Sequence, residues 1–145
     1  MDEVVEIIMK LRSVSSTNEK LYVLENNKHN QLLQKVLFYT YNPYFKYGIS
    51  EQVFENYKQH KIPQKNVFDL LDELIRTNIT DTLRSKVVRC VNDQPSHHQD
   101  VVKCIFLKDL KIKLNTKSIN KVWKNLIPDF QIQLAESLAS QKDNV

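Results

Sequence analysis

The chain contains one glycine, Gly48, among its 145 residues, whereas an average protein of this length has about ten. All-β sandwiches and barrels rely on glycine for the positive φ angles of their tight turns, so the shortage disfavours both. It also excludes the dinucleotide motif G-x-G-x-x-G, the phosphate loop G-x-x-x-x-G-K-[ST] and the nucleophile elbow G-x-S-x-G. We therefore expect helices and none of these three sites.

Apolar residues recur three and four positions apart along most of the chain, the spacing of one buried helix face. This pattern predicts helices over residues 4–11, 17–24, 32–37, 53–57, 67–75, 83–91, 97–110 and 117–123. The residues expected to cap helices are Ser16, Ser50, Asn66, Thr80, Ser96 and either Asn115 or Thr116. The predicted fold class is all-α, a single compact domain of seven or eight helices over residues 1–128.

Residues 129–145 are predicted to form an extended C-terminal linker. Phe130, Ile132 and Leu134 alternate there with polar residues, a strand-like period of two. A lone strand has no pairing partner in an all-helical domain. This segment therefore either becomes helical or pairs with something outside the chain.

The cellular compartment is indicated by the cysteines and by the N-terminus. Two cysteines, Cys90 and Cys104, are too few for a disulfide framework and favour a reducing compartment. The opening sequence MDEVVEIIMKL has acidic residues where a signal peptide needs basic ones. No segment approaches the ~18 apolar residues of a membrane span. We expect a cytoplasmic protein that does not contact a membrane.

Positive charge is concentrated near the C-terminus. Residues 101–128 hold seven lysines and one acid, Asp109, a net charge of +6 in a chain whose total is +4, which leaves −2 for the remainder. A basic segment on a nearly neutral body indicates an anionic partner, nucleic acid before membrane.

The residues around this basic segment supply the candidate binding site. A helix N-terminus presents unpaired N–H groups, so the turn at residues 115–118 is a candidate phosphate contact, and lysines 117, 121 and 124 share one helix face. The alternative is a solvated lysine face, which the spacing alone does not distinguish from a binding face. The candidate DNA-binding residues are Lys46, Lys111, Lys113, Asn115, Thr116, Lys117, Ser118, Lys121 and Lys124.

Of these candidates, Lys46 lies outside the basic segment, in the aromatic segment at residues 39–49, YTYNPYFKYGI. Such aromatic residues stack on bases in single-strand binders, but they more often fill the core beneath a loop, which is the interpretation favoured here. Lys46 lies beside Gly48, where a backbone can approach a ligand closely.

The remaining clusters do not predict chemistry. Cys90, His97, His98 and Cys104 follow the pattern C-x6-H-H-x5-C, which lacks the C-x2-C or H-x3-H pairing of zinc sites, and both cysteines fall on apolar helices. No catalytic Ser–His or Cys–His arrangement stands out. We therefore expect no catalytic residue, no metal ligand and no cofactor in this chain.

Three stretches resemble the N-terminal DNA-binding domain of bacteriophage-type ATP-dependent DNA ligases. They are residues 120–123 (NKVW) followed by 126–128 (LIP), residues 16–20 (STNEK) with 24–28 (LENNK) and 32–33 (LL), and, more loosely, Thr40-Tyr41. They occur in the order found in those ligases, and the similarity spans residues 1 to about 135. The NKVW and LIP motifs are moderately specific, and the common order strengthens the match.

The resemblance implies an all-helical domain that lies against the minor groove of nicked double-stranded DNA, in DNA replication and repair. A separate nucleotidyltransferase domain, using ATP and magnesium, would seal the nick, and the chain would act as a monomer in the host cytoplasm. In that family the loop after Asp109-Leu110 approaches the DNA backbone, which here implicates Lys111, Lys113, Asn115, Thr116 and Lys117.

Two departures from the family stand out. The glycine usual in that loop is replaced by Lys111-Ile112-Lys113, and the catalytic motif K-x-D-G is absent from the chain. No lysine is therefore assigned to adenylylation, and the chain alone is not expected to be an enzyme. The alternative function is a small helical protein–protein interaction module that does not bind nucleic acid.

Overall fold

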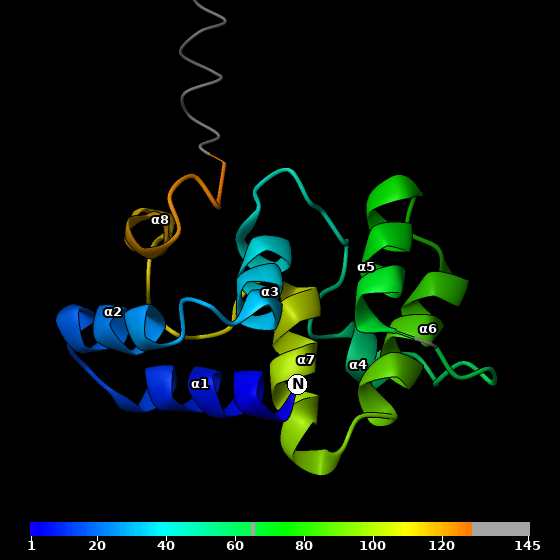
Figure 1. Ribbon diagram of the computed structural model, residues 1–145. Helices are drawn as coiled ribbons and strands as arrows, with labels where there is room; N and C mark the ends of the chain where they lie inside the picture. Colours follow the sequence, from blue (N-terminus) through cyan, green and yellow to red (C-terminus); the bar gives the residue numbers. More distant parts are fainter. Residues whose placement is uncertain (65, 129–145) are drawn as a thin grey trace, which may run out of the picture.

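The computed structural model describes residues 1–64 and 66–128, which fold into eight helices without a strand in those ranges (Figure 1). The helices are α1 (Asp2–Ser13), α2 (Thr17–Asn26), α3 (Gln31–Tyr41), α4 (Val53–Asn56), α5 (Val67–Arg76), α6 (Asp81–Asn92), α7 (Ser96–Leu107) and α8 (Thr116–Val122). The predicted all-α class is confirmed. The alternating residues Phe130, Ile132 and Leu134 lie outside the described part of the chain.

Helix α7 forms the centre of the domain. It packs against α1, α3 and α6, while α2 packs on α1 and α8 lies against α2 (Figure 1). Its inward face is apolar and fully buried, since Val101, Val102 and Ile105 have no exposed surface and Phe106 has almost none. Burying apolar surface on several neighbours at once is the main stabilising contribution to such a fold.

Most predicted caps are confirmed. The side chains of Ser16, Asn66, Thr80 and Asn115 each accept a hydrogen bond from a backbone N–H in the first turn of α2, α5, α6 and α8. These bonds satisfy donors that have no partner within the helix. Asn30, which was not predicted as a cap, caps α3 in the same way.

Two predicted caps are wrong. Helix α4 begins after Gln52, and Ser50 contributes only its carbonyl, which accepts from the N–H of Val53 in a preceding turn. Ser96 is already the first residue of α7. The Gln99 amide donates to the carbonyls of Asn92 and Gln94 before the helix.

The aromatic segment packs into the core, as favoured from the sequence. The ring centroids of Phe38 and Phe45 are 5.4 Å apart, and those of Tyr39 and Phe68 are 5.2 Å apart. Tyr47 is buried, and its hydroxyl donates to the carbonyl of Tyr39. Edge-to-face contacts of this kind stabilise a core beyond the area that they bury.

No helix in the described residues is both long enough and apolar enough to cross a bilayer.

Candidate nucleic-acid interface

The loop between α7 and α8 alternates between buried and exposed side chains. Leu110, Ile112 and Leu114 point into the core, while Lys111 and Lys113 are exposed. Lys111 and Lys113 have φ angles of 61° and 56°. This left-handed region favours glycine, so the loop keeps a glycine-like backbone at the positions where the sequence departs from the ligase pattern.

Contacts from distant parts of the chain hold this loop in place. Arg12 Nε, at the end of α1, donates to the Leu110 carbonyl at 2.8 Å, and Arg12 Nη1 pairs with Asp100 of α7 at 2.5 Å. The Leu110 N–H donates to the hydroxyl of Tyr41 at 3.1 Å. The loop is therefore bonded to α1 and to the end of α3, and its two lysines project from a fixed backbone.

A pocket of about 240 Å³ opens where this loop meets α1 and α2, and we call it the basic pocket. Its lining residues are Arg12, Ser13, Val14, Ser15, Lys20, Lys111, Ile112 and Lys113. Four of these residues are basic and none is acidic. The arrangement suits an anion, since the three lysines and the hydroxyl groups supply donors and positive charge.

Lys20 is the most unusual residue of the basic pocket. It belongs to α2 and is only 5% exposed. Within residues 1–64 and 66–128, no hydrogen bond or ion pair is made by its ammonium group. Buried charges are normally paired, so an unpaired ammonium at a pocket wall favours binding of an anion there.

Helix α8 presents most of the remaining candidates. Thr116, Lys117 and Lys121 are exposed on the helix. Lys124 is also exposed, but it follows the end of α8 at Val122, so it does not extend the helix face predicted for Lys117 and Lys121. Trp123 Nε1 donates to the Lys28 carbonyl at 2.9 Å, which fixes α8 against the end of α2.

Ser118 differs from the other candidates. Its side chain is buried, and its N–H donates to the Asn115 side chain at 2.8 Å. The N-terminus of α8 therefore has part of its hydrogen-bonding capacity satisfied from within.

Lys46 does not line the basic pocket but a second hollow in the surface. It lines a space of about 560 Å³ with Gly48 and Lys108 rather than the basic pocket. Lys108 Nζ donates to the Asn42 carbonyl at 2.6 Å and lies 5.3 Å from the Tyr47 ring centre. Burial, and secondarily the nearby charge of Lys46, lowers the pKa of Lys108 to about 8.

Four polar residues of the basic pocket were not predicted from the sequence, namely Arg12, Ser13, Ser15 and Lys20. They are remote in sequence from the basic segment, and Lys20 occupies an ordinary polar position of a short capped helix. Among them only Lys20 carries a sequence signal, because it ends the segment 16–20 that resembles the phage-type ligases.

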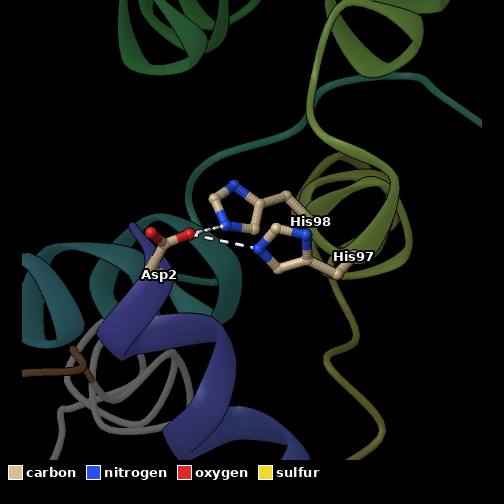
Figure 2. A group of neighbouring side chains, drawn as sticks. All are labelled: Asp2, His97 and His98. Carbon is tan, nitrogen blue, oxygen red and sulfur yellow. Dashed lines mark hydrogen bonds and ion pairs between the residues drawn. The ribbon is translucent and has the colours of Figure 1, made fainter.

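The cysteines and histidines do not assemble as one group. Cys90 and Cys104 are buried free thiols, and burial raises the pKa of Cys90 to about 11. His97 and His98 instead meet Asp2 of α1 (Figure 2).

Comparison with known proteins relates the chain to phage enzymes. No family model matches it. It is 27% identical over 139 residues, 92% of its length, to the DNA ligase of Enterobacteria phage T4, and equally to that of Enterobacteria phage T6. It spans about 28% of the length of these relatives. The chain is thus a distant homologue of part of the phage T4 and T6 DNA ligases.

Proposed function

We propose that this chain is the DNA-binding part of an ATP-dependent DNA ligase and contacts the sugar–phosphate backbone of a nicked duplex. The observation that carries the proposal is the convergence of exposed loop lysines with buried Lys20 on the basic pocket. The similarity to phage DNA ligases is the reason for proposing DNA as the anion that binds there. Sealing of the nick, with its ATP and magnesium, is assigned to a separate nucleotidyltransferase domain.

In the described part of the chain, the lysines of the proposed interface are free to meet phosphates. Several basic residues elsewhere on the domain pair with acids, as in Arg84–Asp81 at 2.7 Å, Arg89–Asp93 at 2.8 Å and Lys86–Glu73 at 3.5 Å, although not all do. Among the described residues, no ion pair involves the lysines at 111, 113, 117, 121 or 124. Unpaired lysines release counterions from DNA without first breaking an internal contact.

The proposed binding mode is insensitive to base sequence. Lysine is a compact charge on a flexible stem, which suits a phosphate but not a base edge. The basic pocket would hold one phosphate, and Lys117, Lys121 and Lys124 would follow the backbone beyond it. Arg12 acts differently: because Asp100 and Leu110 already engage it, we assign it to positioning the loop.

The test is a fluorescence-anisotropy titration of labelled nicked and intact duplexes at several salt concentrations. We expect non-specific dissociation constants of about 10⁻⁴ to 10⁻⁶ M at physiological salt, with a log–log salt slope of about −0.9 per phosphate neutralised. Tighter binding of the nicked duplex would support the nick-holding role. Salt-independent binding, or none at low salt by a folded protein, would refute the function.

A matched pair of variants locates the site. Lys113→Glu with Lys117→Glu should abolish binding, whereas Lys58→Glu with Lys61→Glu should leave most of the affinity. Both doubles change the net charge equally. The control lysines are exposed in the segment between α4 and α5, at the opposite side of the domain from α8 (Figure 1). Equal losses in the two doubles would indicate a net-charge effect without a defined site.

One observation favours the alternative of a protein-interaction module. Tyr22 is 68% exposed beside a hollow of about 400 Å³ between α1 and α2. Exposed aromatic residues next to a hollow are typical of protein contacts. Capture of a defined protein from nuclease-treated lysate, lost in Tyr22→Ser, together with no retention of DNA, would support this function instead.

A further inference from the structure

A second cluster of chemically capable side chains lies apart from the basic pocket, where the N-termini of α1 and α7 meet. Asp2 is the first residue of α1, and His97 and His98 are the second and third residues of α7. Both imidazoles direct Nε2 toward the same carboxylate oxygen of Asp2 (Figure 2). His97 Nε2 is 3.2 Å from Asp2 Oδ1, and His98 Nε2 contacts that same oxygen.

The spacing of these three atoms fits a small coordination sphere. They all lie within 4.8 Å of one another. In a tetrahedral zinc site with bonds of about 2.0–2.1 Å, neighbouring ligand atoms are separated by about 3.3 Å. The His97–Asp2 distance is close to this value, and a rotation of the exposed Asp2 side chain would bring the remaining atoms toward it. Two nitrogens and one oxygen leave a position open for water.

Burial of one member and exposure of the others suit reversible metal binding. His98 is 6% exposed, which limits the movement of its ring, while Asp2 and His97 face solvent and leave a route of entry. Imidazole and carboxylate together suit zinc, cobalt(II) and nickel(II) better than magnesium or calcium. The positive end of the α7 dipole opposes a cation, so binding should be weaker than at a four-ligand structural zinc site.

We propose that Asp2, His97 and His98 form a binding site for one divalent ion of the zinc type, held by Asp2 Oδ1 and the two Nε2 atoms. The ion joins the first turn of α1 to the first turn of α7. Binding therefore stabilises the folded chain, because the unfolded chain does not hold the three ligands together.

The test uses the full chain without an affinity tag, titrated with Zn²⁺ by calorimetry and with Co²⁺ by visible absorption. We expect one ion per chain and a melting temperature that rises with Zn²⁺. His97→Ala and Asp2→Asn should each lower the affinity at least tenfold and remove the Zn²⁺-induced stabilisation. Both residues are exposed, so these variants should fold. His29→Ala, which removes an exposed histidine outside the cluster, should bind as the unaltered chain does.

Three results would overturn the proposal. One is the absence of saturable Zn²⁺ or Co²⁺ binding, and another is unchanged affinity in His97→Ala. The third is a sulfur-to-cobalt charge-transfer band, since this would assign the ion to Cys90 or Cys104. The burial of both thiols argues against that assignment.

Discussion

Replacing Lys20 by methionine should make the folded chain more stable while weakening its binding to DNA. Methionine keeps most of the apolar stem of Lys20, which is only 5% exposed, and removes an ammonium that has no partner among the described residues. An unsatisfied buried polar group costs about 1–3 kcal/mol. Taking the lower end, because the group borders a pocket, we expect a gain of about 1 kcal/mol, or about 4 °C in melting temperature.

The effect on DNA follows from counterion release. One phosphate contact fewer should make the log–log salt slope shallower by about 0.9. The ratio of the DNA affinity of the unaltered chain to that of the variant should then fall about 3.5-fold as the salt concentration rises from about 50 to about 200 mM. The variant should bind more weakly at every salt concentration in this range, with the largest difference at the lowest salt.

Urea denaturation and salt-dependent anisotropy on the same protein samples provide the two measurements. Lys58→Met is the control, since it removes an exposed lysine from a remote segment and should change neither stability nor slope appreciably. A Lys20→Met variant that is less stable than the parent chain and binds DNA with an unchanged slope would refute the reasoning. The ammonium would then have a stabilising partner and no role at the phosphate.

Three further predictions concern the loop, α8 and the second hollow. Lys113→Gly should be about 0.5–1 kcal/mol more stable than Lys113→Ala in urea, because φ at residue 113 is 56°; a more stable alanine variant would contradict the left-handed backbone. Trp123→Phe should cost about 2–3 kcal/mol, since it leaves a void and removes the bond to the Lys28 carbonyl; a loss below about 0.5 kcal/mol would show that α8 is held by other contacts. Burial, and secondarily the charge of Lys46, lowers the pKa of Lys108 from 10.5 to about 8 in the folded chain. Above pH 8 the unfolded chain therefore binds more protons than the folded chain, and the free energy of unfolding should rise toward about pH 10. Because Lys108 is partly exposed to solvent, we expect this rise to exceed that of Lys108→Met by only about 1 kcal/mol. Equal pH dependence of the two chains in urea denaturation would contradict that shift.

Much of the fold could be predicted because its signals are local. Apolar spacing located the cores of the helices, and Ser16, Asn66, Thr80 and Asn115 marked four N-termini. The failures at Ser50 and Ser96 have a common cause: a hydroxyl before an apolar run also fits a turn, or the first helical residue, and only the surrounding backbone decides.

The candidate site was predicted only in part, for a different physical reason. Lys111 and Lys113 belong to a continuous basic segment, which charge counting detects. Lys20 and Arg12 reach them only through tertiary packing, and no local pattern records that proximity. Ser118 is a different case, because it precedes Ile119 and lies four residues before Val122, the last residue of α8, so the helical period alone could have placed its side chain on the buried side.

The bond from Arg12 to Leu110 spans 98 positions of the chain, and the bond from Trp123 to Lys28 spans 95. During synthesis, α1 and α2 leave the ribosome long before the residues that fix them in place. Contacts of such long range form late, after the loops between them close. The two walls of the basic pocket therefore meet only once the chain has been made as far as Lys113. A nascent chain that stops earlier carries Lys20 and Arg12 but has no assembled pocket.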